Sequence, residues 1–290
     1  MSEAPKQIAG LQEIAGRYSA LFCDVWGVLH NGVRAFPDTV DALCRFRSET
    51  GGSVVLVTNA PRPAEAIAVQ LASFDVPDEA FDSIVTSGDV TRAAVAARPG
   101  ARVYHLGPER DLGFYDGLEV ALVSSQEAEL VSCTGLFDDT TEGPEDYREQ
   151  LSAFIARDLP MICANPDIVV ERGDRMVWCG GALARLYAEL GGDVTLSGKP
   201  HPPIYEAAMA NAGLTDRSRV LAVGDGLQTD IRGACNAGID ALFITGGIHS
   251  ENFGPLLVPD PQKVRARLGE EGLSATAFMP VLAWQNGSAR

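Results

Sequence analysis

The sequence feature that most constrains the fold is a set of short apolar runs, rich in β-branched residues, that recur along the chain. They lack the alternation of a half-exposed strand, so they are typical of strands buried on both faces of a parallel sheet. Stretches with helical periodicity lie between them, and strand followed by helix, repeated, predicts an α/β fold with a doubly wound parallel sheet. The runs are Ala20–Cys23, Ser53–Val57, Val220–Val223 and Ala241–Ile244, and the helical stretches are Pro63–Phe74, Ile204–Ala212 and Thr229–Ala237.

The middle of the chain has a different pattern, with helices expected at Glu145–Arg157 and Gly181–Leu190. This pattern predicts a second α/β unit, at residues 87–192, inserted into a core formed by residues 1–86 and 193–290. One more helix is expected at Gln262–Leu268, in a tail to which we assign no function. The strands expected in the inserted unit are Val103–Leu106, Val120–Ser124, Leu130–Thr134, Met161–Ala164 and Ile168–Glu171.

Composition and charge exclude several kinds of partner. The 290 residues are 46% apolar and 21% charged, which is ordinary for a globular protein. A formal net charge of −16 argues against binding of nucleic acid or of an anionic membrane, because both need clustered basic side chains. No run approaches the ~20 apolar residues that span a bilayer, and the N-terminus lacks an apolar signal-peptide core. The six cysteines form no CxxC pair, so we expect buried free thiols in a reducing cytoplasm.

The first candidate site is the segment LFCDVWGVLHNG, which runs from Leu21 to Gly32. An apolar strand ends at Asp24, which places a carboxylate at the mouth of the predicted sheet. There it can act as a nucleophile or as a metal ligand. The alternative interpretation is an aspartate that only caps the turn after the strand.

Two further segments can bind an anion. Thr58 and Asn59 end another buried strand, where a hydroxyl, an amide and backbone N–H groups can surround an oxyanion. Lys199 stands between Gly198 and Pro200, just before a helix, and can reach an anion as a point charge. The alternatives are an ordinary helix cap for the first pair and a solvated loop lysine for the second.

The most specific local signal is VLAVGDGLQTDIRG, in which Asp225 ends a buried strand and Asp230 follows five residues later. Two carboxylates at a strand end and a helix start suit an oxygen-preferring cation such as Mg²⁺. Asp230 alone has the alternative of capping the helix. Taken together, three aspartates, a threonine and a lysine at the ends of core strands predict a site for Mg²⁺ and a phosphoryl group.

This order of strand-Asp, strand-Thr, Lys before a helix and strand-GDxxxxD resembles the haloacid dehalogenase superfamily. The inserted unit resembles the type 2 cap of the NagD-like, class IIA branch, whose members include phosphatases of sugar phosphates, nitrophenyl phosphate and pyridoxal phosphate. The segment ANPD, from Ala164 to Asp167, resembles the cap signature of that branch, and GGALARLYAELGG and GKPHPPIYEAA resemble its later blocks.

The resemblance implies roles for the core residues. Asp24 would be the nucleophile that forms an aspartyl phosphate, and it would also bind Mg²⁺. The backbone carbonyl of Trp26 and the carboxylate of Asp225 would complete the set of protein ligands. Thr58 and Lys199 would hold the phosphoryl oxygens.

It implies supporting roles for four other residues. Asp230 would orient Lys199 or a nearby water molecule. Asn59 would lie beside the phosphoryl group, and Asn165 and Asp167 would lie near the surface of the cap that selects the substrate. Apart from the resemblance, Arg62 and Arg172 are candidate contacts for a second anionic group, with ordinary surface arginines as the alternative interpretation.

One departure from the family pattern concerns the general acid and base. Phosphatases of the superfamily carry a second aspartate two residues after the nucleophile, and Trp26 occupies that position here. An indole can neither protonate a leaving alcohol nor activate water, and losing such a group costs about 10²–10⁴ in rate. His30 is the nearest titratable substitute in the sequence, although it is also interpretable as a loop histidine. Trp26 is interpretable as packing under the cap or as stacking on an aromatic substrate.

The sequence therefore predicts a cytoplasmic, Mg²⁺-dependent hydrolase of a small phosphorylated metabolite, such as a sugar phosphate, with no nucleic-acid or membrane partner. Because of Trp26, a weakly active or non-catalytic phosphometabolite-binding module stays open, as does a phosphotransferase. A homodimer formed through the caps occurs in the branch and also stays open.

Overall fold

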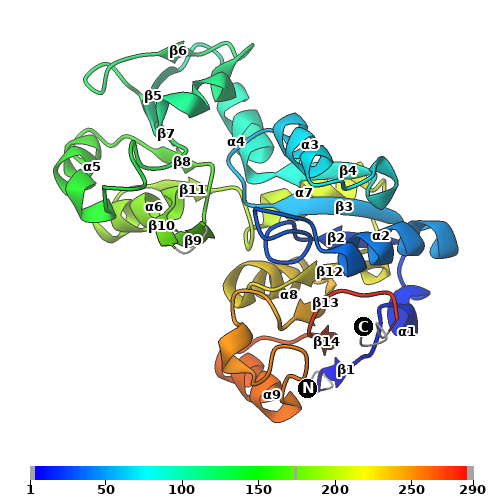
Figure 1. Ribbon diagram of the computed structural model, residues 1–290. Helices are drawn as coiled ribbons and strands as arrows, with labels where there is room; N and C mark the ends of the chain where they lie inside the picture. Colours follow the sequence, from blue (N-terminus) through cyan, green and yellow to red (C-terminus); the bar gives the residue numbers. More distant parts are fainter. Residues whose placement is uncertain (1–3, 173–174, 286–290) are drawn as a thin grey trace. The chain divides into compact units, whose positions relative to one another are not determined.

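The computed structural model describes residues 4–172 and 175–285, with only the backbone of Glu171 and Arg172. The chain divides into two compact units (Figure 1). The first unit comprises Met1–Thr58, Ile67–Val85 and Lys199–Arg290, and the second comprises Asn59–Ala66 and Thr86–Gly198. The chain therefore passes between the units directly after Thr58 and directly before Lys199. The division into a core and a cap, with boundaries at 86/87 and 192/193, stays a prediction.

The first unit is built on a seven-stranded sheet with the strand order β1-β14-β13-β12-β2-β3-β4. All pairings from β1 to β3 are parallel. From the central β2 the chain moves outward to β3 and β4, and later returns to β12 and moves outward on the other side. The order reverses between β2 and β12, which is where doubly wound sheets bind ligands. The strands are β1 Lys6–Gln7, β2 Ala20–Cys23, β3 Ser53–Thr58, β4 Ser83–Thr86, β12 Val220–Gly224, β13 Asp240–Ile244 and β14 Ala277–Met279.

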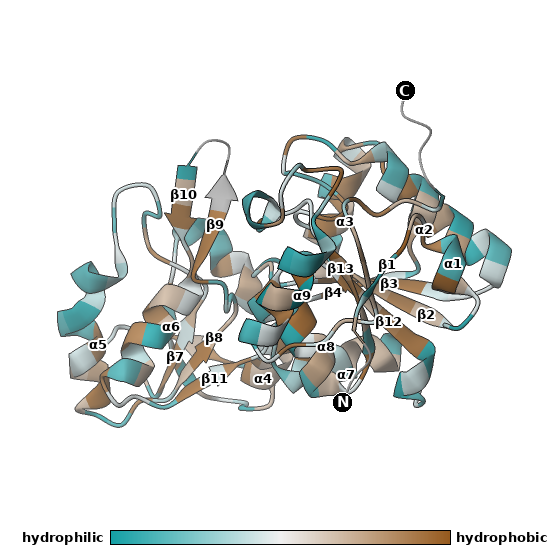
Figure 2. Ribbon diagram, turned by 90° about the horizontal axis from the view of Figure 1, so that it is seen from below, coloured by the Kyte–Doolittle hydropathy of each residue, from teal (hydrophilic) through white to brown (hydrophobic). Residues whose placement is uncertain are grey.

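The helices beside this sheet bury one apolar face each. In α2, Pro37 occupies the first turn and Gly51 ends the helix with a left-handed φ of 68°. Ala42, Leu43 and Phe46 lie on its buried side. Figure 2 shows mostly hydrophobic strands and helices whose outer faces are hydrophilic. The helices are α1 Gln12–Ala15, α2 Pro37–Thr50, α3 Ala64–Ser73, α7 Pro202–Asn211, α8 Arg232–Ala237 and α9 Pro261–Glu270.

The second unit contains a five-stranded parallel sheet with the order β11-β8-β7-β5-β6. Leu151, Tyr187 and their neighbours form one apolar cluster of this unit, and Phe114, Leu130 and Ile162 belong to another. The elements are α4 Ser87–Ala96, β5 Arg102–Leu106, β6 Ala121–Leu122, β7 Leu130–Cys133, α5 Arg148–Ile155, β8 Met161–Cys163, β9 Val169–Arg172, β10 Arg175–Trp178, α6 Gly180–Glu189 and β11 Val194–Leu196.

The predicted α/β fold with a doubly wound parallel sheet is confirmed, and the structure adds detail to two predicted elements. The segment Ile168–Glu171, predicted as a strand, forms β9, which pairs antiparallel with β10 outside the five-stranded sheet. The edge strand β11 of that sheet was not predicted. The helix predicted over Thr229–Ala237 is split into a π-helical turn at Leu227–Ile231 and α8.

Two other expectations concern the cysteines and the membrane. All six cysteines are free, as expected. Cys235 is exposed and Cys44 is only partly buried, so the prediction that all are buried is wrong for these two. No helix in the described part of the chain combines the length and apolar character needed to cross a membrane.

Candidate active site

Three aspartates gather at the carboxyl edge of the first unit's sheet, where the strand order reverses. Asp24 directly follows β2, Asp225 directly follows β12, and Asp230 lies in the π-helical turn after β12. Each is at least nine-tenths buried. One carboxylate oxygen from each lies within 4.8 Å of the others. Parallel strands that end side by side thus bring together carboxylates that are two hundred residues apart in the sequence.

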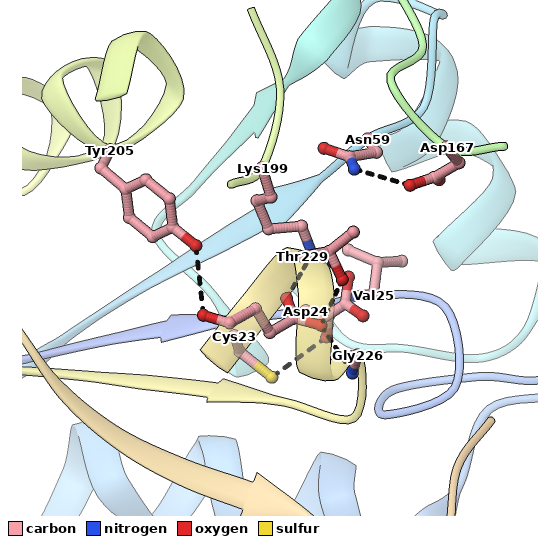
Figure 3. A network of polar contacts seen from close by, with 10 residues as sticks. Cys23, Asp24, Val25, Asn59, Asp167, Lys199, Tyr205, Gly226 and Thr229 are labelled. Atoms are coloured by element: carbon pink, nitrogen blue, oxygen red, sulfur yellow. Dashed lines mark hydrogen bonds and ion pairs between the residues drawn. The ribbon is translucent and has the colours of Figure 1, made fainter. Parts of the chain in front are cut away.

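Lys199 joins this group as its cation. Its Nζ donates to Oδ1 of Asp24 at 2.6 Å and to Oδ1 of Asp230 at 2.7 Å (Figure 3). The side chain is 4% exposed, so both ion pairs are shielded from water. The interpretation of Lys199 as a solvated loop lysine is therefore wrong. Within the described residues, three buried carboxylates lie beside one buried ammonium group in this site.

The electrostatics of the group follow from this imbalance. Burial, followed by the charge of Asp230, raises the pKa of Asp24 well above its usual range, against the opposing effect of Lys199. Burial and Asp230 also raise the pKa of Asp225 to about 7. Burial acts to lower the pKa of Lys199, but the charges of Asp230 and Asp24 outweigh it and raise that pKa above its usual value. Lys199 therefore stays protonated, and its single positive charge does not balance the three buried carboxylates.

Backbone N–H groups fix the orientation of each carboxylate. Val25 donates to Oδ1 of Asp24 at 2.7 Å, and Gly226 donates to Oδ2 of Asp230 at 2.9 Å. Ile248 donates to Oδ2 of Asp225 at 2.8 Å. Among the described residues, nothing donates to Oδ2 of Asp24 or to Oδ1 of Asp225. One oxygen of Asp24 and one oxygen of Asp225 are thus left for a ligand, whereas both oxygens of Asp230 accept hydrogen bonds.

Two glycines make room for Asp225. A Cβ atom added to Gly27 would lie 2.4 Å from Oδ2 of Asp225, and one added to Gly247 would lie 1.8 Å from the same oxygen. Gly27 also has a φ of 86°, which disfavours other residues. The segment around Gly247 was not singled out in the sequence. Its signal is the glycine pair Gly246-Gly247, one residue after the buried strand β13, at the edge where ligands bind.

These groups fit a divalent cation. Mg²⁺ binds oxygen ligands at 2.0–2.1 Å, so opposite ligands lie roughly 4 Å apart, close to the spacing of these carboxylates. The Trp26 carbonyl, two residues beyond Asp24, accepts no hydrogen bond from the described residues. A cation would also supply the positive charge that the three carboxylates lack.

Thr58 ends β3 on the same edge of the sheet. Cys23 of β2 pairs with Leu56 of β3, so Thr58 and Asp24 both lie just beyond this register position. Thr58 is 6% exposed. The structure thus brings Thr58, Asp24, Lys199, Asp225 and Asp230 to one edge of one sheet.

Trp26 and His30 form a small aromatic cluster in the loop after β2. The Trp26 side chain is 40% exposed, and its ring closely approaches Gly32. His30 is buried, with its ring 5.3 Å from that of Trp26 and 5.1 Å from that of Phe74. The Gly32 N–H donates to Nδ1 of His30 at 2.9 Å. An acid/base role for His30 stays a prediction.

The remaining candidates belong to the second unit. Nδ2 of Asn59 donates to Oδ1 of Asp167 at 2.7 Å (Figure 3). Oδ1 of Asn165 accepts from the Asp167 N–H at 3.1 Å. Arg62 is exposed, and the side chain of Arg172 lies outside the described residues. Asn59 and Asp167, predicted separately as substrate contacts, thus bind each other.

Comparison with known proteins identifies the family. Residues 21–120 match a family model described as haloacid dehalogenase-like hydrolase, and residues 196–270 match one described as HAD-hydrolase-like. The crystal structure of a haloacid dehalogenase-like hydrolase from Brucella suis 1330 is 47% identical, with a TM-score of 0.82 over 96% of this chain and 100% of that chain. The chain belongs to the haloacid dehalogenase-like family.

Two further relatives are phosphatases. The ribonucleotide monophosphatase NagD of Escherichia coli K12 is 27% identical over 79% of this chain and 88% of its own length. The D-glycerol 3-phosphate phosphatase of Mycobacterium tuberculosis is 29% identical over 83% of this chain, and the match spans 66% of that relative's length. A structure of glycerol phosphate phosphatase from the same organism, in complex with magnesium, is 25% identical, with a TM-score of 0.64 over 81% of this chain and 70% of that chain.

These comparisons confirm the predicted family, its NagD-like class IIA branch and its phosphatase-like hydrolase character. Phosphatases of the family use a divalent metal ion. The residues at the sheet edge provide a setting for such an ion, and the roles of individual residues follow as proposals.

Proposed function

We propose that this haloacid dehalogenase-like protein hydrolyses a small phosphorylated metabolite with Mg²⁺ as cofactor and Asp24 as nucleophile. The observation that carries the proposal is the buried group of Asp24, Asp225, Asp230 and Lys199 at the point where the sheet order reverses. Its surplus of buried negative charge is costly without a cation. We further propose that residues 1–86 and 193–290 act as the catalytic core and residues 87–192 as its cap.

Asp24, Asp225 and the Trp26 carbonyl would hold the magnesium ion. Bound there, the ion would neutralise the carboxylates and let a phosphate dianion approach them. The open oxygens of Asp24 and Asp225 support this assignment. Asp230 differs because both of its oxygens already accept hydrogen bonds, from Lys199 and from the Gly226 N–H. Its proposed task is to keep Lys199 charged and in place.

The chemistry proceeds in two steps. A carboxylate oxygen of Asp24 attacks phosphorus, the bond from phosphorus to the leaving oxygen breaks, and an aspartyl phosphate results. Water then attacks phosphorus and releases inorganic phosphate, which regenerates the carboxylate. Thr58 and Lys199 would hold the phosphoryl oxygens. Lys199 would donate to them the N–H that it donates to Asp24 in this structure, while its hydrogen bond to Asp230 persists.

Trp26 bears on which substrates react well. With an indole where the relatives' general acid would stand, a leaving group that needs no proton is favoured, such as an aryl or acyl phosphate. If His30 supplies the proton instead, His30→Ala lowers turnover of alkyl phosphates at least about tenfold and flattens the pH profile between 6 and 7. An unchanged profile would show that His30 does not supply this proton.

The relatives support a small phosphate monoester as substrate, with glycerol phosphate or a sugar phosphate as the first choice. Asn59, Asn165 and Asp167 are proposed to border the substrate. The free thiols support a reducing compartment, and we propose the cytoplasm. The acidic chain favours no nucleic-acid or membrane partner. A homodimer remains a proposal for measurement.

The test is phosphate release from a panel of glycerol 3-phosphate, hexose phosphates, p-nitrophenyl phosphate and acetyl phosphate. Each substrate is assayed with Mg²⁺ and with a chelator, on the wild type and on Asp24→Asn. The proposal expects Mg²⁺-dependent release that the variant loses. Stabilisation against heat by these compounds without release would favour a binding module, and a phosphorylated acceptor in place of phosphate would favour a transferase.

A further inference from the structure

The Asn59 side chain links three segments of the second unit. Its Nδ2 donates to Asp167 at 2.7 Å. Its Oδ1 faces Gly198 so closely that a Cβ added to Gly198 would lie 2.5 Å from it. Asn59 is 5% exposed, so its amide is shielded from competing water.

Asn59 and Gly198 are each covalently next to a residue of the proposed phosphoryl site. Asn59 is covalently next to Thr58, and Gly198 is covalently next to Lys199. Thr58 and Lys199 are the two residues proposed to hold the phosphoryl oxygens. The amide of Asn59 thus lies one peptide bond from one member of the phosphoryl cradle and in contact with the residue before the other.

The segment that starts at Asn59 is anchored at two more points. The Gly88 N–H donates to the Ala60 carbonyl at 3.0 Å. The Ala64 N–H donates to Oδ2 of Asp89 at 2.9 Å. The backbone leaving Thr58 is therefore held by contacts within the second unit, and Asp167 contributes one of them at Asn59, the residue next to Thr58.

We propose that Asp167 is a positioning residue that acts through Asn59. By holding the Asn59 amide between itself and Gly198, it sets the backbone on which Thr58 is carried and the packing of the residue before Lys199. Asp167 thereby sets the affinity of the site for the phosphoryl group, which all substrates share. Its effect does not depend on which leaving group the substrate carries. This inference rests on the proposed phosphatase function and extends it to a residue 108 positions from Asn59.

The test reverses the direction of the hydrogen bond. Asn59→Asp places two carboxylates face to face and is expected to lower kcat/KM about tenfold or more. Asp167→Asn keeps an acceptor for the Asn59 amide and is expected to lose less than about threefold. The double variant N59D/D167N exchanges the two side chains, so that an amide at position 167 donates to a carboxylate at position 59. It is expected to recover to within about threefold of Asp167→Asn.

A second readout separates positioning from contact with the substrate's leaving group. Inorganic phosphate has no leaving group, so its inhibition constant reports the phosphoryl cradle alone. The proposal expects this constant to rise in Asn59→Asp and recover in the double variant, with equal changes in kcat/KM for glycerol 3-phosphate and p-nitrophenyl phosphate. Thermal unfolding of each variant, with Asp146→Asn as an exposed control in the same unit, checks folding.

A double variant as impaired as Asn59→Asp would overturn the proposal, as would an unchanged inhibition constant. If the wild type releases no phosphate, the phosphatase function fails. In that case, calorimetry of inorganic phosphate binding with Mg²⁺ tests the positioning role of Asp167. Binding that is lost in Asn59→Asp and recovered in the double variant supports this role. If the wild type also fails to bind phosphate, the phosphatase function and the positioning role of Asp167 are both overturned.

Discussion

Replacing Lys199 with methionine tests whether the lysine is the main counter-charge of the buried aspartates. The ammonium group donates to Asp24 at 2.6 Å and to Asp230 at 2.7 Å, and all three side chains are at most 10% exposed. Methionine has a similar length and no charge, so the variant removes the cation while largely filling its space.

The expected magnitude follows from these contacts. Removing one member of a buried ion pair costs about 3–5 kcal/mol, because the other member stays buried without its partner. Here two carboxylates lose their partner, while the cost of burying the ammonium group is relieved. We therefore expect a loss of about 3 kcal/mol at pH 8, or roughly 6–12 °C in melting temperature. At pH 5 the loss is smaller, because the raised pKa of Asp24 lets it take up a proton.

The assay is urea unfolding of the wild type and Lys199→Met at pH 5 and pH 8 in the presence of a chelator. Lys263→Met, on the exposed side of α9, is the matched control. If the free energy of unfolding falls by less than about 1 kcal/mol at pH 8, or by the same amount at both pH values, Lys199 is not the main counter-charge of Asp24 and Asp230.

Three further predictions concern neighbouring groups. Trp26→Asp is expected to raise turnover of alkyl phosphates at least about tenfold over Trp26→Asn, with little change for p-nitrophenyl phosphate, and steady-state rates of both variants measure this. Since the pKa of Asp225 rises from 3.8 to about 7 on folding, the neutral form is favoured in the folded protein. This contributes roughly 4 kcal/mol to the free energy of unfolding, at ~1.4 kcal/mol per pH unit. The contribution is fully present below pH 3.8 and is lost as the pH rises through 7. Urea unfolding with a chelator should therefore show a flatter pH dependence for Asp225→Asn than for the wild type. Gly247→Ala would place its Cβ 1.8 Å from Asp225 and is expected to weaken Mg²⁺ binding about tenfold or more in a calorimetric titration, whereas Gly269→Ala, where a Cβ has open space, leaves it unchanged.

Much of the fold follows from local sequence patterns. Ala20–Cys23 is β2 without change, because a run of four apolar residues buried on both faces suits a central parallel strand. The π-helical turn that contains Asp230, at Leu227–Ile231, was not predictable from periodicity. It places Asp230 where its carboxylate bonds back to Gly226 and to Lys199, and this tertiary contact overrides the regular helical pattern. The strand β9 was predicted, but its antiparallel partner β10 was not, since a short apolar run does not specify its partner strand.

The candidate site was only partly accessible from sequence. The aspartates, Thr58 and Lys199 could be singled out because each follows or precedes a recognisable core element. The ion pairs between them could not be predicted. Lys199 and Asp24 are 175 residues apart, and only the folded structure determines which of the three aspartates Lys199 contacts. The bond between Asn59 and Asp167 is likewise a contact across 108 residues. Nor does spacing reveal that Gly247 must lack a side chain beside Asp225.

If Asp24 carries the phosphoryl group during turnover, the aspartyl phosphate can be trapped chemically. Borohydride reduces an aspartyl phosphate to homoserine, so the enzyme is quenched into borohydride during turnover with Mg²⁺ and analysed by peptide mass spectrometry. We expect homoserine at position 24 only when substrate and Mg²⁺ are both present. Full turnover without modification at position 24, and with activity retained in Asp24→Asn, would contradict this role of Asp24.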